Sequence, residues 1–257
     1  MVAISPIAIG PTEMRRTRIA LVDALRGSAL AAMIVYHFSW DLELFELAPL
    51  DVTGNPLWVA FAWVIAGSFL ALAGVSLVLA HGDRLNALGF SRRLMMIVAA
   101  AGAITLVSWY FEPGGVILFG ILHCIAASSV LGLAFLRVPV AVVLSAAAAC
   151  FAAPAFLTLP LFNAPGWLWL GLASEPQPSN DYVPLLPWFG TVLIGIAGAR
   201  LALAQASKAE WSRWRPRSAV SRMLALAGRH SLSVYLVHQP VLLGALWLVA
   251  KSGMWSN

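Results

Sequence analysis

Seven stretches of about 20 mostly apolar residues follow one another along the chain, and they constrain its fold more than any other feature. Inside a bilayer no water satisfies backbone N–H and C=O groups, so segments of this length must cross it as helices. Hydrophobic residues make up 61% of the 257 residues and charged residues only 11%, whereas a soluble domain has about 25% charged residues. The sequence therefore predicts an all-α, multi-pass membrane protein folded as one helical bundle. The predicted spans are residues 19–38, 57–80, 94–111, 115–136, 138–159, 184–206 and 229–250.

The connecting segments separate by the sign of their charge. Basic residues precede the first span and lie in the links from two to three, four to five and six to seven, whereas the other links are acidic apart from Lys251. This separation predicts an N-terminus in the cytoplasm and a C-terminus outside the cell membrane. We expect a cytoplasmic tail over residues 1–18, one transmembrane domain over 19–250 and a short tail over 251–257. The net charge of +5 then reflects topology and contact with anionic lipid head groups, not nucleic-acid binding.

Small residues recur at helical spacing in the sixth span, at Thr191, Gly195 and Ala199. Such spacing lets the backbones of two membrane helices approach closely. We therefore expect this face of the sixth span to pack directly against another helix.

The first span is apolar, yet it contains Asp23, Arg26, His37 and Asp41. At 100° per residue all four lie within an arc of roughly 60° on one side of the helix. Ionisable residues inside a membrane face the bundle interior and are functional candidates. Asp23 and Arg26 have a plainer interpretation, because residues spaced i,i+3 can simply pair with each other, or Arg26 can extend to the interface.

His37 and Asp41 are spaced i,i+4 near the predicted outer end of the first span. A carboxylate that orients an imidazole is the arrangement that general-base catalysis uses. The same two residues also fit half of a metal site or an ordinary interfacial pair. Spacing alone leaves the three interpretations open.

The seventh span has a second polar stripe. Ser231, Tyr235 and His238 lie within about 60° of each other on one helix face, and Gln239 and Pro240 follow. Pro240 disturbs the backbone, and we expect this face to line the central cavity.

Other polar candidates lie in the fourth span and before the sixth. His123 stands alone in the fourth span, where a single histidine is more often a packing residue than a ligand. Asp181, Tyr182 and Trp188 begin the sixth span at the outer face, where His37 is also expected.

Five runs occur in order from Leu21 to Pro240: LVDALRGSALAAMIVYHFSWDL, LALAGVSLVLA, FGILHCIA, DYVPLLPWFGTVLIGIAGAR and LAGRHSLSVYLVHQP. Together they resemble the bacterial multi-pass membrane proteins grouped with the catalytic domain of heparan-alpha-glucosaminide N-acetyltransferase. The pattern from Arg26 to His37 also resembles the broader integral-membrane acyltransferases, which acylate sugars and lipids. The resemblance implies transfer of an acyl group, typically acetyl from acetyl-CoA, to an amino or hydroxyl group of a carbohydrate-like acceptor.

For an enzyme of this kind, His37 is the candidate base and Asp41 the group that orients it. Arg26, deeper toward the cytoplasm, is expected to contact the CoA phosphates or the acyl carbonyl. The remaining candidates for binding the donor or the acceptor are His123, Asp181, Trp188, Tyr235, His238 and Gln239. One departure concerns the family's catalytic histidine, which lies in the loop after the first span, where this chain has Leu47-Ala48-Pro49.

Three other functions fit the same residues. The polar stripes suit a transporter or binding protein that carries a small molecule or proton without modifying it. His123 and His238 suit axial ligation of haem, although we expect neither a metal nor haem in this protein. An assembly role, including a homo-oligomer, is the third alternative.

Overall fold

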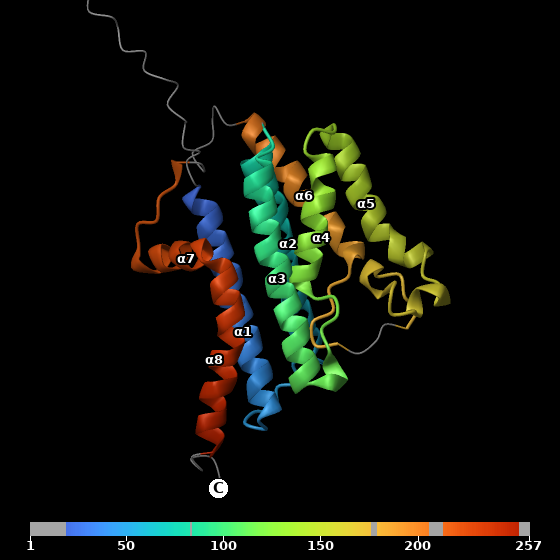
Figure 1. Cartoon of the computed structure of the whole chain (residues 1–257). Helices are drawn as coiled ribbons and strands as arrows, with labels where there is room; N and C mark the ends of the chain where they lie inside the picture. Colours follow the sequence, from blue (N-terminus) through green and yellow to red (C-terminus); the bar gives the residue numbers. More distant parts are fainter. Residues whose placement is uncertain (1–18, 83, 176–178, 206–212, 252–257) are drawn as a thin grey trace, which may run out of the picture.

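The computed structural model describes residues 19–82, 84–175, 179–205 and 213–251, and all the regular structure within these ranges is helical (Figure 1). The helices are α1 (Ala20–Leu44), α2 (Pro56–His81), α3 (Ala87–Phe111), α4 (Ile121–Gly132), α5 (Val140–Phe156), α6 (Leu185–Ala204), α7 (Ala219–Arg229) and α8 (Ser231–Lys251), with short 3-10 turns η1 (Pro113–Gly115), η2 (Leu133–Phe135), η3 (Pro160–Asn163) and η4 (Leu168–Leu170). The predicted tail over residues 1–18 lies outside the described residues, as do residues 252–257 of the predicted tail over 251–257, whereas Lys251 is the last residue of α8.

The predicted helical membrane bundle is confirmed. Each of the seven predicted spans overlaps one of the helices α1 to α6 and α8. Five of the described helices, α1, α2, α3, α6 and α8, are long and apolar enough to cross a membrane, and α4 with η2 and α5 are shorter apolar helices. The orientation of the bundle relative to the cytoplasm stays a prediction.

Two predicted starts were wrong by several residues. α3 begins at Ala87 instead of residue 94, because the Asn86 side chain accepts the Gly89 N–H at 3.0 Å and so caps the helix earlier. Arg92 and Arg93 therefore lie within α3 and not in the link before it. α4 begins at Ile121 instead of residue 115, after a stretch that contains the η1 turn.

α6 lies at the centre of the bundle and packs against α2, α4 and α5. Its buried side chains Val192, Leu193 and Ile196 form the main apolar core with Leu70 of α2 and Val143 of α5. This core holds the shorter helices α4 and α5 against the long spans.

The seam between α2 and α6 is closed by glycines. A Cβ added to Gly195 would lie 2.1 Å from the Ala71 carbonyl oxygen, and one added to Gly74 would lie 2.1 Å from the Val192 carbonyl oxygen. The two backbones therefore touch, which confirms the close contact predicted from the small residues around Gly195.

α7 was not predicted. Figure 1 shows it at one side of the bundle, lying crosswise to α1, against which it packs. The crossing depends on two glycines, since a Cβ on Gly27 would lie 1.9 Å from the Leu224 carbonyl oxygen and one on Gly228 would lie 1.8 Å from the Asp23 carbonyl oxygen. α8 then leaves α7 and runs beside α1.

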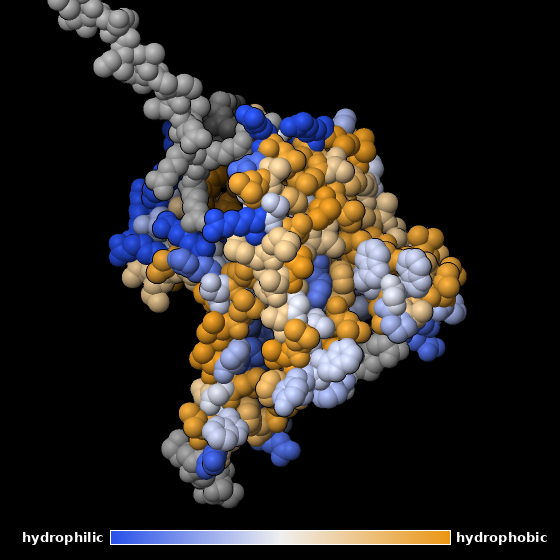
Figure 2. Space-filling view, viewed as in Figure 1, coloured by the Kyte–Doolittle hydropathy of each residue, from blue (hydrophilic) through white to orange (hydrophobic). Residues whose placement is uncertain are grey.

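The surface matches a membrane protein. In Figure 2 hydrophilic residues gather near α7 and the upper helix ends, and a broad hydrophobic surface covers the part of the molecule below them. α8 contributes much of this apolar surface, because Leu246 is its only buried residue among those described. Trp109, Trp167 and Trp169 are exposed near the lower ends of α3 and α5, as expected of an aromatic belt.

Candidate functional site

The polar face of α1 points into the protein, but it forms two separate clusters. At the first, Nη1 of Arg26 donates to Oδ1 of Asp23 at 3.1 Å, and Nη2 of Arg26 donates to the Ser76 hydroxyl of α2. The Arg229 Nε lies 3.6 Å from Oδ2 of Asp23. The plainer interpretation of Asp23 and Arg26 is therefore correct for their contacts: they pair with each other.

This first cluster is built by the α1–α7 crossing. The close approach at Gly27 and Gly228 brings Arg229, the last residue of α7, to the buried carboxylate of Asp23. Asp23 is only 2% exposed, so two guanidinium groups offset the cost of burying its charge.

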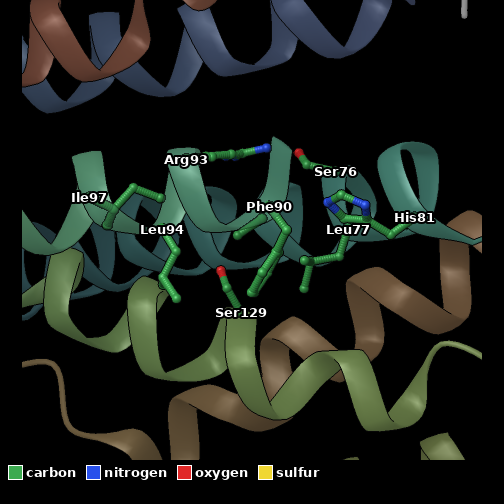
Figure 3. Close-up of a pocket in the computed structure, with 9 residues that line it drawn as sticks. Ser76, Leu77, His81, Phe90, Arg93, Leu94, Ile97 and Ser129 are labelled. Carbon is green, nitrogen blue, oxygen red and sulfur yellow. The ribbon is translucent and has the colours of Figure 1, made fainter. Parts of the chain in front are cut away.

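A small pocket lies beside this cluster, between α2, α3 and α4 (Figure 3). Its volume is about 10 Å³, room for about one water molecule. Ser76 of α2 connects it to Arg26, and the Arg93 side chain extends over it toward Ser76. The lining residues are Ala73, Ser76, Leu77, His81, Phe90, Arg93, Leu94, Ile97 and Ser129.

Sequence reasoning missed the polar members of this pocket. Arg93 was predicted to lie between the second and third spans, and Ser76, His81 and Ser129 were not among the candidates. The signal that could have found the pocket is His81, an ionisable residue at the end of an apolar run.

An apolar layer separates the first cluster from the second. Leu30 and Met33 continue the same face of α1 and are 1% and 3% exposed, and they pack with Ile65 of α2. Phe69 and Tyr235 close this layer. Apolar side chains thus separate the two polar parts of this face over the middle of α1.

The second cluster joins α1 to α8. The ring centroids of His37 and His238 are 4.9 Å apart, at an interplanar angle of 58°. Nε2 of Gln239 donates to Oδ1 of Asp41 at 2.6 Å, and Asp41 is completely buried. On the polar face of α1, His37 thus lies beside His238 of α8, and Asp41 binds Gln239, the next residue of α8.

The predicted partnership of His37 with Asp41 takes a different form. Among the described residues no hydrogen bond joins them; the carboxylate instead accepts from Gln239. Gln239 was predicted as a binding residue, and it holds Asp41 in place across the helix interface.

His238 has a defined tautomer. Its Nδ1 lies 2.6 Å from the Tyr235 carbonyl oxygen, which only accepts hydrogen bonds, so Nδ1 carries the proton and Nε2 of the neutral ring is an open lone pair. Nε2 is buried and has no hydrogen-bond partner among the described residues. The same is true of Oδ2 of Asp41 and Oε1 of Gln239. Three buried polar atoms thus lack partners in one place, which is rare in a folded protein and marks a site.

That the polar stripe of α8 lines a central cavity stays a prediction, but the central residues of the stripe face the bundle. The Tyr235 ring packs against Phe69 and lies 5.7 Å from the His238 ring, and it contacts all three apolar clusters of the core. His238 is partly buried whereas Val237 beside it is exposed. The polar stripe of α8 therefore faces α1 and the core.

His123 belongs to a different part of the structure. Its Nδ1 accepts the Gly120 N–H at 3.2 Å and its Nε2 lies 3.3 Å from the Thr105 hydroxyl. Both ring nitrogens are thus engaged by the protein, so the arrangement is that of a packing residue at the start of α4 and does not suit an axial ligand of haem.

Asp181 also supports the start of α4. Its Oδ2 accepts the Ile121 N–H at 3.0 Å, which places a carboxylate at a helix N-terminus that Gly120 leaves without a capping side chain. Burial raises the pKa of the Asp181 carboxyl to about 6, and the hydrogen bond from Ile121 opposes this shift.

Trp188 packs within the bundle. Its ring lies 6.3 Å from that of Trp63 in an edge-to-face arrangement, beside Gly67 of α2.

The α1–α2 link, which contains Leu47-Ala48-Pro49, is held by a hydrogen bond of 2.7 Å from the Val52 N–H to the Glu43 carboxylate. Within the described residues, no group of three or more His, Cys, Asp or Glu side chains is arranged to hold a metal ion.

Comparison with protein families gives one result. The family model described as heparan-alpha-glucosaminide N-acetyltransferase, catalytic, matches residues 18–240. No curated protein and no solved structure shows a significant match. The matched range begins just before α1 and ends at Pro240, so it includes both polar clusters.

Proposed function

The chain belongs to the catalytic family of heparan-alpha-glucosaminide N-acetyltransferase, and from this premise we propose that it transfers an acetyl group from acetyl-CoA to a hydroxyl or amine, within the membrane, at the second polar cluster. The observation that carries the proposal is the unpartnered, buried Nε2 of His238 beside His37. A neutral imidazole with a fixed tautomer is the group that general-base catalysis needs.

The chemistry requires one proton acceptor and one carbonyl carbon. Nε2 of His238 takes the proton of the acceptor O–H or N–H while the acceptor atom attacks the acetyl carbonyl carbon. The C–S bond then breaks and the thiolate of CoA receives that proton, so the products are the acetylated acceptor and free CoA. His37, the base expected from the sequence, lies beside this ring and offers an N–H to the carbonyl oxygen or relays the proton.

Asp41 and Gln239 act on the same step through position and charge. Asp41 is completely buried, and its Oδ2 has no hydrogen-bond partner among the described residues. It is therefore available to accept a hydrogen bond from the acceptor or from the imidazolium that forms during transfer. A carboxylate in that place stabilises the developing positive charge of His238 or His37.

The donor is proposed to enter at the first cluster. Arg26 is about 16 Å from His37 along α1, and a planar guanidinium suits phosphate or carbonyl oxygen. The neighbouring pocket adds the positive charge of Arg93 and the polar side chains of Ser76 and His81 at this end. The apolar layer at Leu30 and Met33 must move for the acetyl group to reach His238.

The test is acetyl transfer by the purified protein in nanodiscs, with labelled acetyl-CoA and glucosamine as the first acceptor. His238→Asn keeps a donor near the position of Nδ1 but removes the Nε2 lone pair, and we expect activity to fall about 10²–10⁴-fold with an unchanged thermal midpoint. His230→Asn is the matched control, because His230 is exposed at the α7–α8 junction.

The same experiment distinguishes the alternatives. If labelled acetyl-CoA binds and no acceptor is acetylated, a binding or transport role is favoured. If His238→Asn lowers the thermal midpoint and leaves turnover per folded molecule unchanged, the histidine is a packing residue and the catalytic assignment is wrong.

A further inference from the structure

α7 differs from the long apolar helices in its direction and its depth. It lies crosswise to α1, whereas α1, α2, α3 and α8 run along the bundle (Figure 1). It crosses α1 at Asp23 and Gly27, which are about 5 and 10 Å along that helix from its first residue, Ala20. Its end leads through His230 into α8, which is long and apolar enough to span a membrane. α7 therefore lies where two spans enter the bilayer, along the membrane surface.

Two faces of α7 are set by the protein and by charge. Ala225 and Gly228 are its buried residues, about 60° apart on the helix, on the side that packs against α1. Arg222 and Arg229 lie about 20° apart on a second face beside the buried one. Both arginines are exposed.

The third face of α7 is apolar and turned away from the protein. Val220, Met223 and Leu226 are 66%, 70% and 57% exposed, and they lie within an arc of about 120° nearly opposite the buried residues. A surface helix of a soluble protein directs its apolar stripe toward the core. A helix that exposes both an apolar and a basic face is instead typical of segments that lie in a membrane interface.

The chain around α7 is strongly basic. Residues 213–230 contain five arginines and neither aspartate nor glutamate. All five arginines are exposed, and Arg229 remains so although it pairs with Asp23. Figure 2 shows hydrophilic residues near α7 that adjoin the broad hydrophobic surface of the bundle. Positive charge at this boundary suits lipid phosphate groups, which a planar guanidinium binds through two N–H groups.

We propose that α7 binds anionic phospholipids of the membrane surface, with Val220, Met223 and Leu226 among the acyl chains and Arg222 at the phosphate groups. The inference concerns a surface outside the second cluster and does not depend on the proposed acetyltransferase function. An anionic lipid is favoured over a zwitterionic one, because the positive group of a zwitterionic head offsets the attraction of its phosphate for arginine. A second copy of the chain is a poorer occupant, since its own α7 carries the same positive charge.

The test measures which lipids lie against the apolar face of α7. The fluorophore nitrobenzoxadiazole is attached at Met223→Cys, in protein whose native cysteines are replaced by alanine, in phosphatidylcholine nanodiscs. Each sample contains the same mole fraction of one spin-labelled quencher, either phosphatidylglycerol or phosphatidylcholine. We expect the spin-labelled phosphatidylglycerol to quench about twofold more strongly or more, because the arginines enrich it around α7.

Two variants show whether the preference belongs to α7. Arg222→Gln removes one positive charge from α7 and should bring the ratio of the two quenching constants toward unity. Arg84→Gln removes the same charge from the link after α2 and should keep the ratio found with Arg222 and Arg84 intact. Both arginines are exposed, so neither substitution removes a buried contact of the fold.

Three results overturn the inference. If neither lipid quenches the fluorophore, the apolar face of α7 is covered by protein and does not lie in the bilayer. If both lipids quench equally without the charge substitutions, the face touches the bilayer but does not select anionic head groups. If Arg222→Gln keeps the preference for phosphatidylglycerol, another part of the protein causes it.

Discussion

The contact between α2 and α6 yields the sharpest prediction for the fold, because α6 carries two glycines with opposite surroundings. A Cβ on Gly195 would lie 2.1 Å from the Ala71 carbonyl oxygen, whereas a Cβ on Gly198 would meet nothing within 4 Å. The two positions lie on the same helix, three residues apart. Gly195→Ala and Gly198→Ala thus differ in packing while they share the same change in helix propensity.

The magnitude follows from the overlap. Cβ atoms in proteins are essentially never closer than 3.0 Å to such an atom, so α2 and α6 must separate by about 0.9 Å locally in Gly195→Ala. The obstacle is backbone and cannot rotate away, and overpacking of this kind costs about 1–3 kcal/mol. Gly198→Ala should instead stabilise the helix by up to about 1 kcal/mol.

The assay is the thermal midpoint of each variant in the same detergent. Because the propensity change is the same in both variants, the difference between them is the overpacking cost of about 1–3 kcal/mol, which corresponds to about 2–12 °C for a chain of this size. Gly195→Ala should also expose more of the α2–α6 seam to a hydrophobic dye before unfolding. A midpoint for Gly195→Ala equal to or above that of Gly198→Ala would refute the reasoning, because the seam would then not be closed by backbone contact.

Three further predictions concern charge. Burial raises the pKa of Asp181 in the folded protein from 3.8 to about 6. The stability contributed by its protonation is therefore complete below about pH 4 and is lost as the pH rises to about 6. The thermal midpoint should fall over this range, and Asp181→Asn should flatten its pH dependence. Arg200 donates to the Val138 carbonyl, so Arg200→Met should lower the midpoint by the equivalent of about 1.5–3 kcal/mol, and an unchanged midpoint would mean that the bond contributes nothing. With the native cysteines replaced, Arg215→Cys should resist and Glu175→Cys should accept an impermeant thiol reagent in intact cells, and the reverse labelling would invert the topology.

Much of the fold follows from local properties of the sequence. The apolar runs predicted where the helices of the bundle lie, although only five of the seven are long enough to span a membrane, because partition into a bilayer depends on the composition of about 20 consecutive residues. The small residues around Gly195 also predicted a close helix contact, because two backbones can approach each other wherever no large side chain lies between them. α7 escaped prediction because it is short and packs across α1 through Gly27 and Gly228.

The candidate site was predicted only in part. The sequence by itself determined that Asp23, Arg26, His37 and Asp41 share one face of α1, since helical periodicity alone sets that relation. Only the tertiary structure decided their partners: Asp41 meets Gln239, 198 residues away, and pairs with it instead of with His37. Such pairs depend on how whole helices pack and rotate against each other, and helical spacing contains no information about that.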